Sequence, residues 1–159
     1  MKTGIDLKVR RKEEFGGLYD INIVDGQIDL VDNFDTALQM SVFCERRADG
    51  SEVLPSFQRR GWWGNTISNR VNFEIGSKIW ILAQSRLTQD VINKIAIYAK
   101  EATDWLVEDG YLEKIDIDVT QRGDTAVRIN FKLFRSNSEV ESLFFDLWNN
   151  TQSFDPRSL

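Results

Sequence analysis

Two consecutive patterns in the second half of the chain restrict its fold most. Residues 89–109 repeat apolar side chains at helical spacing, and one face carries Val91, Ile92, Ile95, Tyr98, Ala99, Ala102, Trp105 and Leu106. Thr88 can cap this helix, and Gly110 can end it as a left-handed residue. Residues 114–121, 126–135 and 142–148 then alternate with a period of two. A core-facing helix followed by an antiparallel meander is predicted.

The first part of the chain predicts more strands and two shorter helices. Residues 18–31 alternate on both sides of Asp25-Gly26, a dipeptide suited to a tight hairpin turn. Asp32 or Asn33 can cap a helix over 34–47, and Ser77 can cap one over 78–87. We therefore predict one α+β domain, with an N-terminal β-hairpin and a C-terminal antiparallel meander packed with three central helices. Its expected limits are 18–149, between an extended arm at 1–17 and a mobile tail at 150–159.

Composition excludes several classes of function. The chain has no His, which removes Ser-His-Asp and Cys-His catalysis and the common zinc, copper and iron sites. Cys44 lies in an apolar stretch and is expected to be a buried, inert thiol. A net charge of −5 disfavours nucleic-acid binding, and no apolar run approaches the length of a membrane span. We predict no metal, no cofactor, no nucleic acid and no membrane partner.

Residues 48–75 have no sustained period, and a long irregular segment in a small domain is usually functional. It contains Arg59-Arg60-Gly61-Trp62-Trp63-Gly64-Asn65. In one interpretation a Trp and an Arg anchor a protein partner, because both residue types are enriched in binding hot spots. In the other, Trp63 fills the core, and Arg59 and Arg60 pair with the acidic segment that begins at Glu101. The two interpretations are compatible.

Acidic residues leave an enzymatic alternative open. Residues 101–118 hold seven acids against one Lys, which predicts a solvated face or a docking face for a basic partner. Paired carboxylates beside aromatic side chains are also the equipment of a glycosidase, so a small cell-wall glycan hydrolase remains the alternative. A carbohydrate-binding module that uses exposed Trp side chains is a third class.

Several segments together resemble a known family. TALQMSVFCERRAD (36–49), RRGWWGN (59–65), GSKIWIL (76–82), SRLT (85–88) and AKEATDWLVEDG (99–110) occur in the order typical of the baseplate protein family of Mu-like contractile phages. That family is similar to the T-even "lysozyme-like" baseplate wedge protein, which is also the sheath initiator. The family usually has acids before the Arg pair and after the second Gly, where this chain has Gln58 and Asn65.

The resemblance implies a non-enzymatic virion protein of the tail baseplate in a contractile injection system, assembled in the host cytoplasm. It implies six copies per baseplate, with other wedge proteins, the tail hub or tube, and the sheath protein as partners. It also implies sheath initiation through sheet edges that sheath subunits extend. The residues expected to bind partners or brace the loop are Arg46, Arg47, Arg59, Arg60, Trp62, Trp63 and Trp80. Those expected to offer a strand for augmentation are Phe144, Phe145, Asp146, Leu147 and Trp148.

Overall fold

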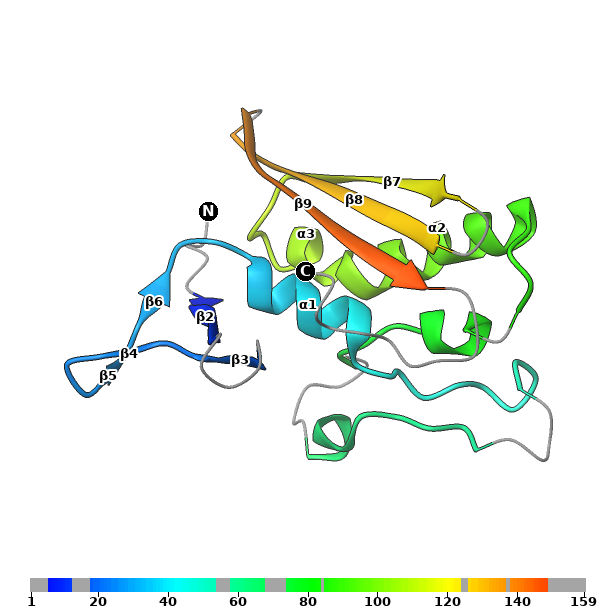
Figure 1. Ribbon diagram of the computed structural model, residues 1–159, viewed down its shortest axis with the longest axis horizontal. Helices are drawn as coiled ribbons and strands as arrows, with labels where there is room; N and C mark the ends of the chain where they lie inside the picture. Colours follow the sequence, from blue (N-terminus) through cyan, green and yellow to red (C-terminus); the bar gives the residue numbers. More distant parts are fainter. Residues whose placement is uncertain are drawn as a thin grey trace.

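The computed structural model describes residues 6–12, 18–53, 58–67, 74–83, 85–123, 126–136 and 138–148. Three layers follow one another in this part of the chain (Figure 1). A three-stranded sheet covers one face of the helices α1 (Asp35–Phe43) and α2 (Gln89–Thr103), and the irregular segment that follows α1 lies on their other side. The helices are therefore the central layer.

The sheet has the order β7-β8-β9 and is antiparallel throughout. Its strands are β7 (Lys114–Arg122), β8 (Ala126–Arg135) and β9 (Ser138–Trp148). Alternation puts the side chains of Val127, Ile129, Phe131 and Leu133 on the helix side, where all four are buried. A bulge in β9 falls opposite Leu133 and Phe134. The alternating pattern read from the sequence is thus the pattern of a sheet with one covered face.

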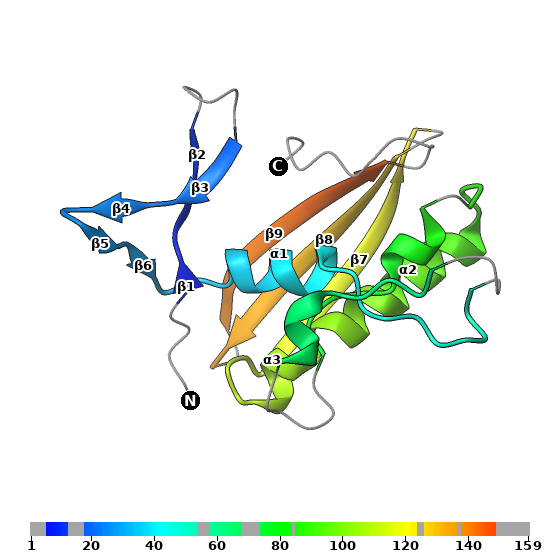
Figure 2. The same ribbon diagram turned by 90° about the horizontal axis from the view of Figure 1, so that it is seen from below.

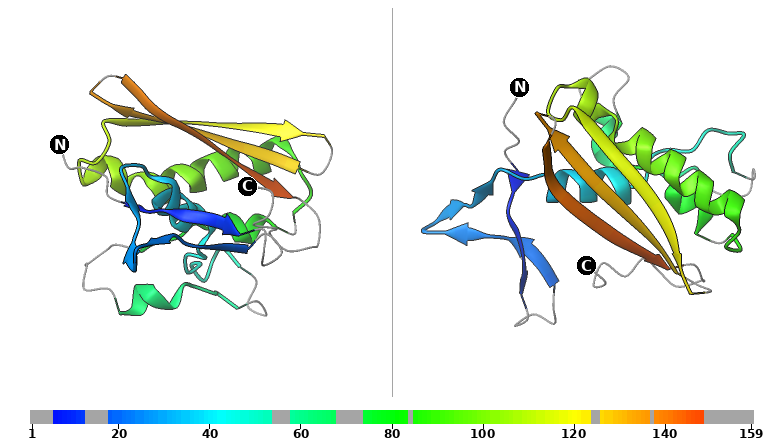
Figure 3. Two further views of the ribbon diagram at one scale, coloured as in Figure 1. Left: turned by 60° about the vertical axis from the view of Figure 1, so that its left-hand side comes forward. Right: turned by 90° about the horizontal axis from the view of Figure 1, so that it is seen from above.

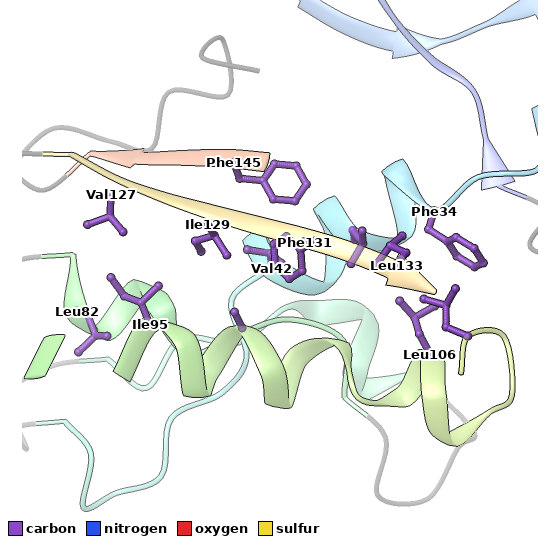
Figure 4. Packing of buried hydrophobic residues seen from close by; sticks show 13 residues of the cluster. Phe34, Val42, Leu82, Ile95, Leu106, Val127, Ile129, Phe131, Leu133 and Phe145 are labelled. Carbon is purple, nitrogen blue, oxygen red and sulfur yellow. The ribbon is translucent and has the colours of Figure 1, made fainter. Parts of the chain in front are cut away.

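The core lies between this sheet and the helices (Figure 4). α2 contributes Ile95 and Ala99, and the short helix α3 (Trp105–Glu108) contributes Leu106. Phe145 of β9 meets Phe43 and Phe131 edge to face, with ring centroids 4.9 and 5.7 Å apart. The Thr88 hydroxyl accepts from the Val91 N–H at 3.4 Å, and Gly110 has a φ of 77°, so both predicted ends are present. The predicted single helix is wrong, because the segment is divided at Asp104 into α2 and α3.

The N-terminal strands form three two-stranded ladders. β1 (Asp6–Leu7) pairs with β6 (Leu30–Val31), β2 (Val9–Lys12) with β3 (Leu18–Ile21), and β4 (Ile23–Val24) with β5 (Gln27–Ile28). They meet at a triangle of backbone hydrogen bonds between Lys8, Asn22 and Asp29, each 2.8 to 3.0 Å long. Figures 2 and 3 show the ladders standing out beside the β9 edge of the sheet.

The start of α1 holds these strands to the rest of the molecule. Asp6 accepts a hydrogen bond from the Ala37 N–H at 3.0 Å, and the Thr36 hydroxyl donates to the Leu7 carbonyl at 2.8 Å. Phe34 occupies the N-cap position without a side-chain bond. The prediction that Asp32 or Asn33 caps this helix is wrong, because a carboxylate from β1 supplies the missing acceptor.

The mixed α+β composition is confirmed, but the predicted arrangement is wrong. The described strands are divided among four sheets instead of one hairpin and one meander. The expected helix over 78–87 is a single 3₁₀ turn, η3 (Ile79–Leu82), so the second of the three predicted central helices is not formed. The Ser77 hydroxyl, expected to cap that helix, accepts from the Ile79 N–H at 3.3 Å at the start of this turn and also donates to the Val42 carbonyl at 2.5 Å. Tertiary contacts overrode helical periodicity here.

Other sequence predictions have separate outcomes. The Asp25-Gly26 turn is present, with φ values of 49° and 77°. Residues 142–148 are strand, as the alternation favours, and not helix. No helix among the described residues has both the length and the apolar character needed to cross a bilayer. The predicted tail at 150–159 lies outside the described residues, as do residues 1–5 and 13–17 of the predicted arm.

Candidate partner-binding site

The segment that follows α1 is fixed by backbone hydrogen bonds to two other segments. Arg46 N–H donates to the Ser77 carbonyl at 2.9 Å, and Ser77 N–H donates to the Cys44 carbonyl at 2.8 Å. On the other side, Trp62 N–H donates to the Glu45 carbonyl at 2.7 Å and Ala48 N–H to the Arg59 carbonyl at 3.0 Å. Residues 44–48 therefore lie between residues 59–65, which we call the Arg-Trp motif, and residues 75–80, and are hydrogen-bonded to both.

Asn65 closes this arrangement. Its amide Nδ2 donates to the Ile75 carbonyl at 2.8 Å, and its Oδ1 accepts from the Ile75 N–H at 2.9 Å. A carboxylate at position 65 could accept from the N–H but, when ionised, could not donate to the carbonyl. The acid expected at this position from the resemblance is thus replaced by an amide that satisfies both backbone groups of Ile75.

The glycines of the motif allow one indole ring to fold over the backbone. A Cβ on Gly64 would lie 2.3 Å from Cη2 of Trp62, so only glycine leaves room for that ring. Gly61 has a φ of 129°, which favours glycine, and Arg60 before it has a φ of 46°. The half-buried Trp62 lies against Gly64, whereas Trp63, at the start of η2 (Trp63–Thr66), is 69% exposed.

Trp63 is therefore outward-facing, which overturns the interpretation in which it fills the core. Its ring centroid lies 5.7 Å from that of Trp62, and Ile67, next to the 3₁₀ turn, is also 69% exposed. Two large apolar side chains thus stand in solvent on one short segment. Exposed aromatic and aliphatic side chains flanked by Arg are typical of a protein-binding surface.

Two of the four predicted arginines, Arg46 and Arg60, brace the loop. Arg60 forms an ion pair with Glu45, and its guanidinium lies 4.9 Å from the centroid of the Trp80 ring. Trp80 donates from Nε1 to the Arg46 carbonyl at 2.9 Å, and Arg46 pairs with Glu74 at 3.2 Å. The predicted residues Arg46, Arg60 and Trp80 are thus brought together. Their exposed ion pairs add little stability individually, so the role of this group is mainly to set geometry.

Arg59 and Arg47 are placed differently. Arg59 donates from Nε to the Ala48 carbonyl at 2.6 Å, and the exposed Arg47 lies over Gly61. Neither forms an ion pair with a described carboxylate. The predicted pairing of Arg59 and Arg60 with the segment after Glu101 is wrong, because Arg60 uses Glu45 and Arg59 a backbone carbonyl.

Lys78 joins the same region to residues 49–52. Its ammonium lies 3.0 Å from Asp49 and 2.9 Å from Glu52. Burial alone would lower the pKa of Lys78, but the hydrogen bonds to Glu52 and Asp49 outweigh it, and the pKa lies above its ordinary value. The hydrogen bond from Lys78 holds the pKa of Asp49 below its usual range. A charged lysine is thus maintained beneath the loop.

Cys44 lies in the segment 44–48, and its surroundings do not activate its thiol. It is half-buried, not fully buried as expected, and burial raises the pKa of its thiol. Within the described part of the chain no three Cys, Asp or Glu side chains gather as metal ligands would. The polar groups at this site are backbone amides, arginines and Lys78 with their carboxylate partners, and Trp63 and Ile67 are the exposed apolar side chains beside them in sequence.

The predicted augmentation strand presents two faces. Phe145 faces the core and is 3% exposed, and Leu147 packs against it, whereas Phe144 is 50% exposed. Asp146 accepts two hydrogen bonds of 2.7 Å from Arg128, whose guanidinium lies 4.1 Å from the Phe144 ring centroid. The hydrogen bonds from Arg128 lower the pKa of Asp146. The Trp148 side chain lies outside the described part of the structure.

A groove runs beside the β9 edge of the sheet. It has a volume of about 310 Å³, and its walls are β1, the start of β2, α1 and the middle of β9. The apolar lining residues are Leu7, Val9, Leu143, Phe144 and Phe145. Asp35 is the one carboxylate among its described lining residues, so the groove does not offer the pair that a glycosidase needs.

Comparison with known proteins shows the family of the chain. The sequence profile of the phage protein GP46 family matches residues 34–140. This chain belongs to the GP46 family. It is 36% identical over 104 residues to the baseplate protein gp46 of Escherichia phage Mu, covering 63% of this chain and 70% of that protein. It is 30% identical over 88 residues to the Mu-like prophage FluMu protein gp46 of Haemophilus influenzae, covering 55% of this chain and 58% of that protein.

The predicted resemblance to the baseplate family of Mu-like phages is confirmed by these matches. The GP46 match includes the Arg-Trp motif, the helices, β7 and β8, and the first residues of β9. It begins after the N-terminal ladders, so residues 6–31 lie outside the matched residues.

Several residues that build the site in this GP46 protein were not singled out from the sequence. Glu45, Lys78 and Arg128 each hold a partner that is remote along the chain, and no local pattern marks such pairs. Arg128 and Asp146 stand directly opposite each other in the β8–β9 register. Alternation of charge on adjacent predicted strands could have indicated that pair, because opposite charges across a ladder attract.

Proposed function

We propose that this chain is a non-enzymatic structural component of a contractile phage tail baseplate. The observation that carries the proposal is its membership of the GP46 family, together with a Mu relative named as a baseplate protein. In this role it joins the wedge to the tail hub or tube, starts the sheath, and is present in six copies per baseplate. Its partners are other wedge proteins, the hub or tube, and the sheath protein, and its location is the virion tail.

Strand addition is the mechanism proposed for sheath initiation. β9 pairs with β8 along one edge, and its other edge borders the groove beside β1. An edge strand offers unpaired N–H and C=O groups, to which an extended segment of a sheath subunit can add. The outward Phe144 and the Arg128–Asp146 pair would then contact alternate side chains of the added strand.

Lysines placed on the two outer strands test this mechanism. Ser142→Lys and Phe144→Lys change exposed positions of β9, and Thr120→Lys is the matched change on β7. Lysine on an edge strand opposes strand addition without removing a core side chain. The β9 variants should keep their urea unfolding midpoint but yield tail tubes without sheath by electron microscopy. Normal sheaths from both β9 variants would contradict strand addition at β9. Loss of the sheath with Thr120→Lys alone would indicate that the sheath subunit adds to the β7 edge.

The Trp63 surface is proposed to anchor the protein to a baseplate partner. Trp63→Ala removes an exposed indole, with Ile97→Ala on the outer side of α2 as a control. Phage carrying Trp63→Ala should accumulate incomplete baseplates, because a central aromatic residue carries much of the energy of an interface. Normal infectious particles would contradict the role of Trp63 as an anchor. The β9 variants test strand addition independently, because they change a different surface.

The glycan hydrolase alternative is not favoured by the described geometry. The groove has one carboxylate among its described lining residues, Asp35, beside Asn33 and Gln39. Incubating the purified protein with peptidoglycan should release no soluble fragments. Turnover that disappears in Asp35→Asn would overturn the non-enzymatic assignment.

A further inference from the structure

The outer edge of β9 has hydrogen-bonding groups that β8 does not use. In an antiparallel ladder the N–H and C=O groups of alternate residues point to opposite sides of the strand. The Phe134 carbonyl accepts from the Glu113 N–H at 2.9 Å, so Phe134 and every second residue of β8 direct these groups towards β7. Phe144, Asp146 and Trp148 stand opposite residues of that set in the β8–β9 register. Their N–H and C=O groups therefore point away from β8, to the outer edge of the sheet.

This edge is long and apolar. β9 has eleven residues, and β8 is the one strand that pairs with it in the described part of the chain. Its last six residues, LFFDLW, hold a single charge, and that Asp146 already binds Arg128 at 2.7 Å. The other edge strand, β7, has the sequence KIDIDVTQR with four charged residues. Because an open apolar edge invites pairing with other chains, native proteins usually cover it, and β9 needs such a cover more than β7 does.

The C-terminal segment 149–159 can reach this edge. It lies outside the described residues, follows Trp148 directly and has the sequence NNTQSFDPRSL. Asn-Asn suits a two-residue hairpin turn, because Asn tolerates the positive φ that a type I′ turn requires at both positions. Such a turn makes residues 148 and 151 a hydrogen-bonded pair, which agrees with the direction of the Trp148 backbone groups. The chain can therefore turn at Asn149-Asn150 and run back along β9.

The register that follows from this turn fits the side chains of the segment. Phe154 stands opposite Phe145, so its side chain is on the face of the sheet that α1 covers, where α1 residues line the groove. The apolar groove then receives the aromatic ring. Pro156 stands opposite Leu143, at a position whose backbone does not bond to β9. Its missing N–H therefore costs no bond with β9, and proline is tolerated in edge strands.

We propose that residues 151–157 form a fourth strand on the outer edge of β9 of the same chain and place the Phe154 side chain in the groove. A two-residue turn tethers this strand, and short tethers give effective concentrations of about millimolar, so a second copy competes poorly. A sheath segment that adds to β9 would take the place of this strand. The inference goes beyond the baseplate role, because the segment lies outside residues 34–140, which match the family.

Proline at two adjacent positions tests the strand and its register. In the proposed pairing the Ser153 N–H donates to the Asp146 carbonyl, whereas the Gln152 N–H points away from β9. Ser153→Pro should therefore release the segment, and Gln152→Pro, the matched control, should leave it bound. Hydrogen exchange of the Phe144 and Asp146 amides, followed by NMR, reports the pairing. Both amides should exchange slowly in the wild type and at least about tenfold faster in Ser153→Pro alone.

The other outcomes of the exchange experiment overturn the proposal. The amides of Leu143 and Phe145 point towards β8 and should stay protected in all three proteins, which checks that the sheet is intact. Fast exchange of Phe144 and Asp146 in the wild type, or equal effects of the two prolines, would contradict the fourth strand. Protection that rises with protein concentration would indicate a strand from a second copy and would contradict the intramolecular contact.

A disulfide measures the same register independently. Phe144→Cys with Asp155→Cys joins opposite residues whose Cα atoms would lie about 5.5 Å apart, within the range that a disulfide spans. Phe144→Cys with Ser153→Cys is the control, because that pair is diagonal, at about 7–8 Å, although it is nearer in sequence. Both proteins carry Cys44→Ser, which removes the native thiol.

A glutathione redox buffer allows each pair to reach equilibrium by thiol–disulfide exchange. The Phe144–Asp155 pair should form an intramolecular disulfide at least about tenfold more favourably than the control pair, whereas an unbound segment would favour the shorter loop of the control. Equal yields, or a higher yield from the control, would overturn the proposed register. Disulfide-linked dimers of the Phe144–Asp155 pair would show that the segment binds to a second copy and would overturn the proposal.

Discussion

The Asp6 carboxylate accepts a hydrogen bond from the backbone N–H of Ala37, at 3.0 Å, across thirty-one positions of sequence. It does for α1 what an N-cap side chain does elsewhere, although it comes from a different element. The bond therefore serves two purposes, since it satisfies the start of a core helix and fixes β1 to the body.

Replacing Asp6 should destabilise the start of α1 and weaken the attachment of β1 to the body. Asp6→Ala should lower the free energy of unfolding by about 1 kcal/mol, the usual cost of losing a capping acceptor. Asp6→Asn, which keeps an acceptor oxygen, should cost less. Urea unfolding measures the loss, and limited proteolysis within residues 18–31 should become faster in Asp6→Ala. Equal stability of the wild type and Asp6→Ala would show that the bond contributes nothing.

Gly64→Ala should disturb the Arg-Trp motif from within. The new methyl group would lie 2.3 Å from the Trp62 ring, so the ring has to move, and overpacking of this kind costs about 1–3 kcal/mol. Trp fluorescence and thermal unfolding report the change. Gly50→Ala is the control, because nothing lies within 4 Å of its Cβ position. Unchanged fluorescence in Gly64→Ala would contradict the packing described for Trp62.

The two adjacent tryptophans should differ in what they contribute. Trp63→Ala should change stability by no more than about 0.5 kcal/mol, as for other exposed positions. Trp62→Ala should be clearly more destabilising, because it removes a half-buried ring from its place on Gly64. Chemical denaturation of the two variants side by side makes the comparison, and the reverse order would mean that the exposures are interchanged.

Asn65→Asp tests the clamp on Ile75. The substitution keeps the shape of the side chain but removes the donor to the Ile75 carbonyl, so we expect a loss of about 1 kcal/mol. Asn93→Asp adds the same charge on α2, where Asn93 only accepts from Gln89, and should cost less. Denaturation midpoints of both variants are compared. A clamp variant as stable as the wild type would show that water replaces the lost donor.

The Arg128–Asp146 pair should contribute to stability in a pH-dependent way. The pKa of Asp146 is lower in the folded protein than its usual value near 4. Stability from the pair is therefore fully present above that usual value and is lost as the pH falls toward the folded pKa. Between about pH 5 and 3 the stability of Asp146→Asn should therefore decrease less than that of the wild type. Asp118→Asn, on the same face, controls for charge, and identical pH profiles for Asp146→Asn and the wild type would refute the linkage.

The sequence predicted elements whose stability is local or whose burial is one-sided. The long helix has its stripe, its Thr88 cap and its Gly110 end, and each strand of the C-terminal sheet carries a regular apolar face. The helix predicted over 78–87 failed because Ser77 and Trp80 bond to residues 42–46, contacts that no local pattern reveals. The candidate site likewise could be predicted only where a local pattern marks it. The sequence indicated the Arg-Trp motif, but the partners Glu45 and Ile75 depend on tertiary structure.

Because residues 58–65 are already bonded to residues 44–48 and 75, the loop has its shape before any partner arrives. Ordering a free segment would cost about 1–2 kcal/mol per residue in backbone entropy alone, and this cost would weaken binding during assembly. In this protein the loop is ordered when the chain folds, so binding does not carry that cost. A rigid loop of this kind should dock in a single step, without a slow rearrangement after encounter. The order in which baseplate parts join would then be set by which complementary surfaces are present and not by local folding.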